Sequence, residues 1–404
     1  MSARELASID LDSLLDAVRE DLVKSPGAID VARVARLLRA GDQVLGAADV
    51  LTAAELVRDH LDGLGPLQDL ISPGVTDLLV NGDGSVWIDG RDGLQRTDRV
   101  LTTQQARDLA VRLAVSGGRR LDDAMPWADA HLPSGIRFHA LLPPLSPTGP
   151  VLSLRLPAAE PLGMDDLESL GAFPAVIGDL LRRIVAARVP FLVTGGTGTG
   201  KSTLLGAMLA AVDAKERIVI VEDALELQVD HPHVVSLQSR HANSEGAGLV
   251  DLSELVRQCL RMRPDRIVLG ECRGAEIRDL LQALNTGHEG GCGTIHANTA
   301  ADVPARLEAL GALAGLDRAA LAAQAASALD LVIHLGRTAA GRCLQEIAVL
   351  HRATSGALTC TSALTVHEGE IRQGPAAAQL QHLLTTDSGS GPTMRLARTG
   401  RRAA

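Results

Sequence analysis

One segment of the sequence, residues 191–203, constrains the fold more than any other. A short apolar run leads into a glycine-rich loop, and a segment with helical character follows. Gly195, Gly200, Lys201 and Ser202 match the phosphate-loop pattern G-x-x-x-x-G-K-[ST]. Glycines allow successive backbone N–H groups to face a polyphosphate, and the start of the next helix adds its positive end. A glycine turn matching by chance is the alternative, and the flanking strand and helix disfavour it.

The same segment assigns roles to its side chains. We expect Lys201 to contact the β- and γ-phosphate oxygens, and the Ser202 hydroxyl to hold Mg²⁺. The sequence therefore predicts a nucleoside triphosphate site. Its expected residues are Gly195, Gly196, Thr197, Gly198, Thr199, Gly200, Lys201, Ser202 and Thr203.

Composition limits the partners of this chain. Its net charge of −10 disfavours nucleic acid and anionic lipid, and a chain with no Tyr, three Phe and two Trp lacks a base-stacking platform. Five widely spaced cysteines are typical of reduced thiols in a cytoplasmic protein. No signal peptide is recognisable and no apolar run approaches the roughly 20 residues of a membrane span, so we expect any membrane contact to be peripheral.

The hydrophobic pattern divides the 404 residues into four parts. Residues 1–66 form an N-terminal helical segment, with helices at 3–23, 31–40 and 53–62 and a role in packing or partner docking. Residues 67–157 form a small α+β domain, with a hairpin at 76–80 and 85–89, a helix at 102–115 capped by Thr102 or Thr103, and strands at 135–142 and 151–156. We expect residues 373–404 to be a disordered, solvated tail, although its terminal arginines leave lipid or nucleic-acid contact open.

Residues 158–372 alternate between strand and helix patterns, which predicts a parallel sheet covered by helices. The expected strands are 190–194, 217–222, 266–270 and a segment near 293–296, followed by 330–335, 343–350 and 358–366. The expected helices are 174–187, 201–212, 251–262, 274–285, 302–313 and 317–328.

Two carboxylates follow predicted strands of this sheet. Glu222 ends the run 217–222, and Glu271 follows the apolar run 267–270 in a Walker-B-like arrangement. Because the carboxyl ends of parallel strands form the ligand edge, both carboxylates are expected beside the phosphate loop. An acidic surface loop is the alternative for Glu222. Glu271 is expected to bind Mg²⁺ through water or to orient the attacking water.

Two histidines, His288 and His296, bracket a glycine-rich strand pattern. A histidine can sense a γ-phosphate as donor or acceptor, although a lone histidine is more often structural. Both enter the site through the resemblance described next.

Four motifs together resemble the secretion-ATPase superfamily of type II secretion, type IV pili and type IV secretion. They are residues 195–203 (Walker A), 220–227 (Asp box), 260–274 (Walker B) and 284–298 (His box). The sequence is most similar to the CpaF-like branch, from tight-adherence (Flp-type) pilus systems, and the upstream runs 118–122 and 132–140 extend that similarity.

The resemblance implies a fold and a mechanism. The expected fold is an α/β RecA-like P-loop NTPase domain with a parallel-rich sheet, preceded by a smaller α+β (PAS-like) domain. The family forms hexameric rings on the cytoplasmic face of the inner membrane, where ATP hydrolysis with Mg²⁺ moves N- against C-terminal domains and drives a membrane platform protein. A RecA-like nucleic-acid motor of the conjugation or helicase type is the alternative.

The resemblance also implies residue roles. Glu222 corresponds to the Asp-box catalytic carboxylate, Glu271 to the Walker-B glutamate, and His288 with His296 to the His-box pair. Arginines of the N-terminal domain close over the nucleotide in such enzymes. The best candidates are Arg137 and Arg155, with Arg120 and Arg240 behind them. The sequence departs from the family at 290–293 and 238–244, which puts coupling at the His box and the role of Arg240 in doubt.

Overall fold

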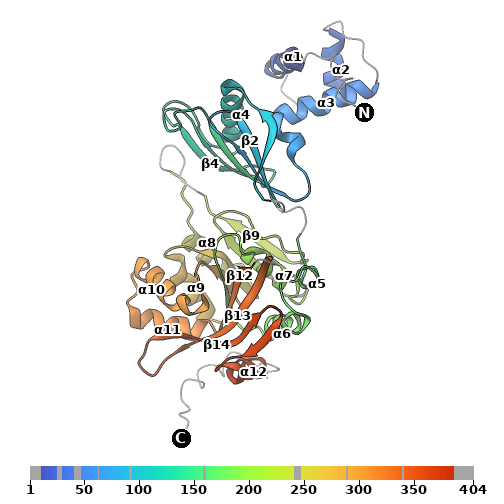
Figure 1. Ribbon diagram of the computed structural model, residues 1–404. Coiled ribbons are helices and arrows are strands. Elements are labelled where there is room, and N and C mark those ends of the chain that lie inside the picture. Colours follow the sequence, from blue (N-terminus) through green and yellow to red (C-terminus); the bar gives the residue numbers. More distant parts are fainter. Residues whose placement is uncertain are drawn as a thin grey trace. The chain divides into compact units, whose positions relative to one another are not determined.

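The computed structural model describes residues 11–24, 30–40, 47–61, 63–90, 93–157, 161–240, 247–287, 290–338 and 341–385. The chain forms two compact units, Met1–Ala159 and Glu160–Ala404, which are described separately (Figure 1). Within the described residues, no helix combines the length and apolar character that crossing a bilayer requires.

The first unit begins with three helices: α1 (Leu11–Lys24), α2 (Val31–Ala40) and α3 (Ala47–Leu61). They pack on one another through apolar side chains that include Val18, Val34 and Val57, all fully buried. The predicted second helix is confirmed, whereas the third begins at Ala47 rather than at residue 53. Residues 3–10 of the predicted first helix lie outside the described residues.

The rest of the first unit is a six-stranded antiparallel sheet in the order β3-β2-β1-β6-β5-β4. Its elements are the 3₁₀ turn η2 (Gly65–Leu70), β1 (Val75–Val80), β2 (Ser85–Gly90), β3 (Gln95–Val100), α4 (Thr103–Ser116), β4 (Trp127–His131), β5 (Arg137–Leu141) and β6 (Val151–Arg155). The hairpin and the helix are confirmed, with Thr102 as N-cap. The predictions missed β3 and β4, because their polar and small residues lack an apolar alternation.

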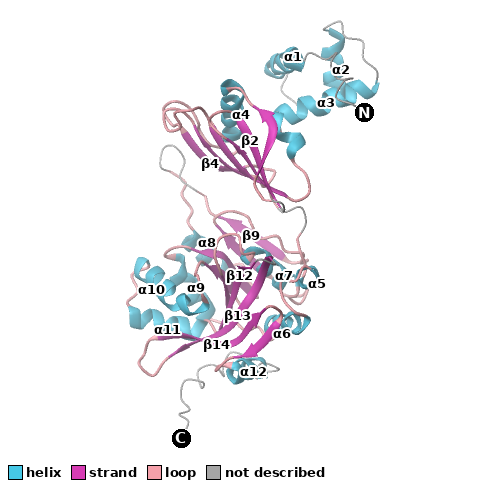
Figure 2. Ribbon diagram, viewed as in Figure 1, coloured by secondary structure: helices cyan, strands magenta, loops and turns pink. Residues whose placement is uncertain are grey.

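The second unit is built on a nine-stranded sheet in the order β15-β14-β13-β12-β7-β11-β10-β8-β9 (Figure 2). The strands are β7 (Phe191–Thr194), β8 (Ile218–Glu222), β9 (Val234–Gln238), β10 (Arg266–Cys272), β11 (Cys292–Ile295), β12 (Leu331–Thr338), β13 (Gly341–Arg352), β14 (Leu358–His367) and β15 (Glu370–Gln373). The six strands from β12 to β9 pair in parallel, and β13, β14 and β15 extend the sheet antiparallel.

Helices cover both faces of this sheet (Figure 1). One face packs against α5 (Met164–Ser169), α6 (Ala175–Ala186), α7 (Lys201–Ala210) and α12 (Ala377–Thr385). The other packs against α8 (Leu252–Cys259), α9 (Glu276–Asn285), η3 (Ala300–Asp302), α10 (Val303–Leu313) and α11 (Arg318–Ala328). The strands are Val-, Ile- and Leu-rich because both of their faces are buried.

The expectation of a disordered tail from residue 373 is wrong for its first part. Residues 377–385 form α12, and Leu380 is buried in the core beneath the sheet. The alanines and glutamines around it suggested disorder, but Leu380, Leu383 and Leu384 recur at helical spacing and give the helix an apolar stripe. Residues 386–404 lie outside the described residues.

The predictions also missed strands β9 and β15.

Candidate functional site

The phosphate loop connects the end of β7 to the start of α7. Gly195, Gly198 and Gly200 have φ angles of 152°, 71° and 92°, which side chains other than glycine rarely adopt. A Cβ on Gly195 would also lie 2.5 Å from the Leu335 carbonyl oxygen. The loop therefore needs glycine for its conformation and for its close contact with β12.

Lys201 folds back over this loop. Its Nζ donates to the carbonyl oxygens of Gly195 and Gly196, at 3.0 and 2.9 Å, and lies 3.4 Å from the His296 ring nitrogens. Burial lowers the pKa of the Lys201 ammonium below its usual range, partly offset by Glu271. A buried cation beside a glycine loop at a helix start fits a polyphosphate, because the ammonium and the loop N–H groups can both donate to phosphate oxygens.

Glu222 ends β8, one strand beyond β10, and is only 3% exposed. Its Oε1 accepts from the backbone N–H groups of Glu226 and Leu227, at 3.2 and 3.0 Å, while Oε2 is buried and has no hydrogen-bond partner among the described residues. Burial raises the pKa of Glu222 to about 7. A carboxylate with a pKa near neutrality and one oxygen without a hydrogen-bond partner among the described residues is suited to accept a proton from water.

A β-bulge in β10 brings Glu271 to the site. The register between β10 and β11 slips between Leu269 and Cys272, so that one extra residue is inserted at Gly270–Glu271. The buried Thr294 hydroxyl donates to the Gly270 carbonyl at 2.6 Å and fastens the bulge to β11. A Cβ on Gly270 would lie 2.5 Å from Glu222 Cγ, so glycine makes room for the neighbouring carboxylate.

Glu271 lies at the centre of a charged cluster. Its Oε2 makes an ion pair with Arg273 at 2.5 Å, and Oε1 lies 3.0 Å from His296 Nε2 without the alignment of a hydrogen bond. Glu276, at the start of α9, accepts from the backbone N–H groups of Arg273 and Gly274 and so orders the turn after the bulge. Burial, then the charge of Lys201, lowers the pKa of His296, which favours its neutral ring.

His296 also lines an open pocket of about 470 Å³ beside the loop. Gly196, Asn298, Asp302 and Arg306 contribute to its wall. The structure thus brings Lys201, Glu271 and His296 together at the carboxyl edge of the sheet, where β8 also delivers Glu222.

The other predicted histidine, His288, lies outside the described residues. Gly287 and Gly290 flank it and precede β11, whereas His296 follows β11. Because β11 crosses the sheet in parallel with β7, the chain enters β11 at the edge away from the phosphate loop. A role for His288 remains a prediction, and its described neighbours do not place it at the loop.

The predicted arginines lie on both units. Arg137 and Arg155 are direct partners across β5 and β6 in the first unit, and face Asp129 and Asp77 at 3.8 and 3.6 Å. Such long, half-exposed ion pairs contribute little stability. Arg120 pairs with Asp122 in the same unit, and Arg240 in the second unit donates to the Gly248 carbonyl. A role in catalysis remains a prediction for all of them.

Binding of Mg²⁺ by Ser202 and Glu271 also remains a prediction. Within the described residues, no three His, Cys, Asp or Glu side chains are grouped as a metal site.

Sequence reasoning assigned no role to Gly270, Thr294 or Arg273. Arg273 stands two residues after Glu271, and this short spacing was the available signal for their ion pair. The contributions of Gly270 and Thr294 depend on strand register across the bulge, for which the sequence carries no local signal.

Comparisons with known proteins agree with this geometry. The family model described as type II/IV secretion system protein matches residues 60–394. A putative conjugal transfer protein of Mycobacterium tuberculosis is 50% identical over 352 residues, covering 84% of this chain and 98% of the relative. The conjugal transfer protein TrbB of Rhizobium radiobacter is 32% identical over 298 residues, covering 72% and 89%.

A solved structure supports the fold. The crystal structure of the pilus retraction motor PilT with bound ADP matches with a TM-score of 0.52 and 21% identity, over 72% of this chain and 84% of that one. This likeness concerns the fold alone. The expected α/β class, with a RecA-like domain preceded by a smaller one, is confirmed.

The close approach of Gly270 to Glu222 yields a test by double-mutant cycle. Gly270→Ala should lower the free energy of unfolding by about 1–3 kcal/mol, because its Cβ overlaps the Glu222 side chain. In a Glu222→Ala background the same change should cost markedly less, since the overlapping atoms are gone. Denaturant unfolding measures all four proteins. Equal costs in the two backgrounds would contradict the contact.

Proposed function

Because the chain belongs to the type II/IV secretion system protein family, we propose that it is an ATP-hydrolysing motor of a secretion or pilus-assembly system. The observation that carries the proposal is the grouping of Lys201, Glu271 and His296 beside a glycine phosphate loop, with Glu222 on the same edge of the sheet. A plain nucleotide-binding module does not need two carboxylates at the phosphate loop.

The residues divide the work of hydrolysis. Bound ATP with Mg²⁺ supplies the phosphoryl group and the counter-charge that organises it. Lys201 and the loop N–H groups hold the phosphates, and the Ser202 hydroxyl is the predicted metal contact. Glu222 takes the proton of the attacking water, and Glu271 orients that water or holds the metal through water. His296 lies close to both Lys201 and Glu271, so it couples the lysine that holds the phosphates to the β10 bulge that carries Glu271.

We further propose that the motor works as a hexameric ring at the inner face of the cytoplasmic membrane, against a membrane platform protein. The support is the family membership. Arg137 and Arg155, adjacent on β5 and β6, are the proposed cations that a moving N-terminal domain brings to the nucleotide. The long, half-exposed ion pair of Arg155 with Asp77 contributes little stability and leaves little free energy for Arg155 to overcome when it moves.

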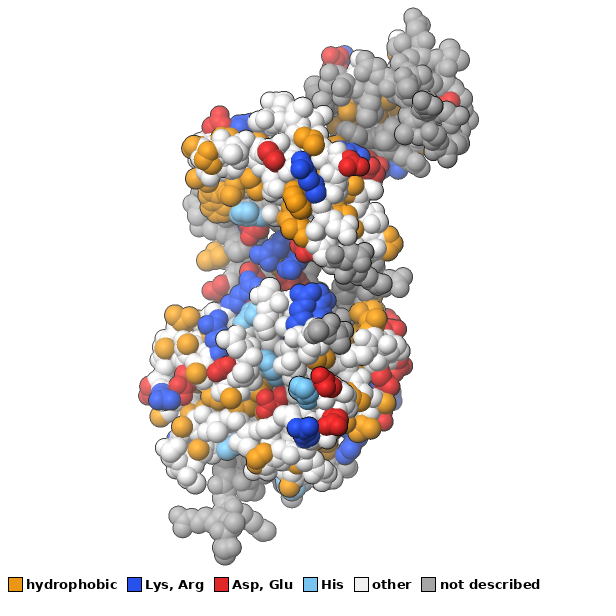
Figure 3. All heavy atoms as spheres, viewed as in Figure 1, with side chains coloured by type: hydrophobic (Ala, Val, Ile, Leu, Met, Phe, Trp, Pro, Cys, Tyr) orange, Lys and Arg blue, Asp and Glu red, His pale blue; other side chains and the backbone are white. Residues whose placement is uncertain are grey.

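A second candidate is a motor that acts in DNA transfer. The observation that favours it is the name of the mycobacterial and rhizobial relatives, conjugal transfer proteins. The net charge of −10 opposes direct DNA binding. Figure 3 shows acidic and basic side chains interspersed over the visible face of the second unit rather than one basic field. ATP turnover stimulated by DNA, with a steep salt dependence, would favour this candidate; absence of stimulation would favour protein export or pilus assembly.

The primary test separates binding from chemistry. Glu271→Gln should bind ATP with near-normal affinity and lose at least about 100-fold in turnover, because removal of a group that stabilises the transition state lowers kcat. Lys201→Ala should weaken ATP binding itself. Binding is measured by calorimetry and turnover by phosphate release. Wild-type-like turnover in Glu271→Gln would sink the assignment.

The pKa of Glu222 predicts a pH dependence. A base must be ionised, so kcat/KM for ATP, which reports the pKa values of the free enzyme, should rise with pH through about 7. The same shift destabilises the fold as pH rises. Between pH 4.5, the ordinary pKa of a glutamate, and about pH 7, Glu222 holds a proton in the folded state that the unfolded chain releases. The free energy of unfolding is therefore lower by about 3 kcal/mol above pH 7 than below pH 4.5. Glu222→Gln should therefore lose turnover and become less pH-sensitive in stability over this window. An unchanged stability profile would show that Glu222 titrates normally.

A further inference from the structure

Two arginines face each other on the hairpin formed by β12 and β13. Arg337 and Arg342 are direct register partners, and both are exposed. Neither guanidinium makes a hydrogen bond or an ion pair with any residue that the structure describes. Like charges directly opposite on paired strands are destabilising. The fold itself therefore gains nothing from this pair of cations.

The hairpin lies directly against the phosphate loop. β12 pairs with β7 from Leu331 to His334, and the Leu335 carbonyl lies so close to Gly195 that a Cβ there would stand 2.5 Å away. Further along, a Cβ on Gly200 would stand 3.7 Å from Arg342 Cδ, an ordinary van der Waals contact. The Arg342 side chain thus lies next to Gly200, the N-cap residue of α7.

Arg342 reaches the loop from the side opposite to the carboxylates. In the sheet, β12 and β13 flank β7 on one side, while β11 and β10, which carry His296 and Glu271, flank it on the other. The Lys201 ammonium points to that second side, toward His296. The first side of the loop is left to Arg342 and Arg337.

We propose that Arg342, assisted by Arg337, binds the α/β-phosphate end of the bound nucleotide. The backbone N–H groups at the start of the loop helix cradle the α- and β-phosphates in phosphate loops, and Arg342 Cδ lies 3.7 Å from where a Cβ on Gly200 would stand. A guanidinium extends several ångströms beyond Cδ and matches two phosphate oxygens at once. Because the γ-phosphate chemistry lies on the other side, the arginine serves binding rather than the hydrolytic step. The inference rests on the proposed function in one respect, that the ligand is a nucleoside polyphosphate.

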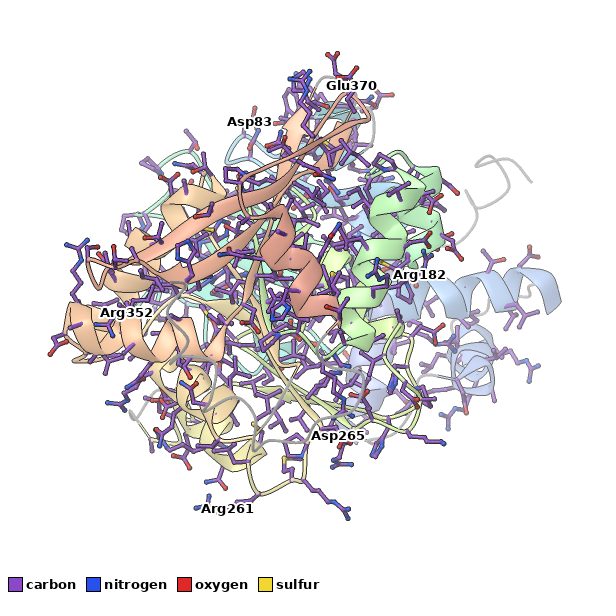
Figure 4. The ribbon with its side chains drawn as sticks, turned by 90° about the horizontal axis from the view of Figure 1, so that it is seen from below. Asp83, Arg182, Arg261, Asp265, Arg352 and Glu370 are labelled. Carbon is purple, nitrogen blue, oxygen red and sulfur yellow. The ribbon has the colours of Figure 1, made fainter. Side chains whose placement is uncertain are left out.

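The chain supplies a matched control on the same strand. Arg352 ends β13, ten residues and roughly 30 Å from Arg342, and donates to the Gly356 carbonyl. Figure 4 labels Arg352 near α11, and it lines a separate pocket together with residues of α11 and α12. Arg352→Ala changes the net charge by the same amount as Arg342→Ala and leaves the surroundings of the phosphate loop unchanged.

The experiment titrates the full-length chain with ADP, tripolyphosphate and adenosine by calorimetry. Arg342→Ala should weaken ADP and tripolyphosphate by about 10- to 100-fold, as expected for one charge-assisted contact. Adenosine affinity should change little, and the loss in ATP turnover should appear as a raised KM. Arg342→Lys should recover part of the loss, Arg337→Ala should show a smaller one, and Arg352→Ala should match wild type. Arg342→Gln serves as a second neutral variant if Arg342→Ala fails to fold.

Three outcomes would overturn the inference. Unchanged ADP affinity in folded Arg342→Ala would show that Arg342 does not contact the phosphates. If the same variant also sedimented differently from wild type, Arg337 and Arg342 would be assigned to contact with an acidic protein surface. Loss of adenosine affinity alone assigns Arg342 to the base rather than to the phosphates. A drop in kcat with normal ADP affinity places it in the chemical step. Failure of the proposed function is distinct, because wild type and Lys201→Ala would then bind ADP equally poorly.

Discussion

The extra residue in β10 is the constraint on which the geometry of the site depends. In a regular strand, the side chains at positions 270 and 271 would point to opposite faces of the sheet. A side chain at position 270 would overlap Glu222 on the neighbouring strand. The bulge turns Glu271 toward His296 and leaves the hydrogen-only Gly270 against Glu222. Thr294, on the neighbouring strand, holds the bulge through the Gly270 carbonyl. Gly270 thus gives the Glu222 side chain its space, and Glu271, next in the bulge, lies beside His296.

The buried charged groups of the site depend on this arrangement of Gly270, Glu222 and Glu271. Burial raises the pKa of Glu222 to about 7 and lowers that of Lys201, so burial disfavours the charged form of both groups. Glu271 compensates part of the cost at Lys201, and Arg273 in turn holds Glu271. A polyphosphate entering the loop would raise the pKa of Lys201 and would also oppose the ionisation of nearby carboxylates. Ligand charge and proton state are thus coupled through one small cluster.

The sequence predicted the parts of the fold and site that local chemistry determines. The loop from Gly195 to Ser202 is one continuous segment, and the apolar runs before Glu222 and Glu271 place both acids at strand ends. What it could not predict depends on register and on long-range contacts. The bulge at Gly270, the pairing of Arg137 with Arg155 and the approach of Arg342 to Gly200 join residues far apart in the chain. Helix α12 was missed because its alanine-rich composition hid a stripe of leucines.

The order of the strands gives the phosphate loop two unlike sides. Toward β11 and β10 it meets His296 and Glu271, whose Nε2 and Oε1 atoms lie 3.0 Å apart. Toward β12 and β13 it meets guanidinium groups, which stay charged at every relevant pH. A nucleotide lying along the loop would thus keep one end on a fixed charge while the other end meets groups that respond to hydrolysis. Loss of the γ-phosphate would then alter the contacts on the second side, whereas the proposed contacts of Arg342 with the other phosphates would persist.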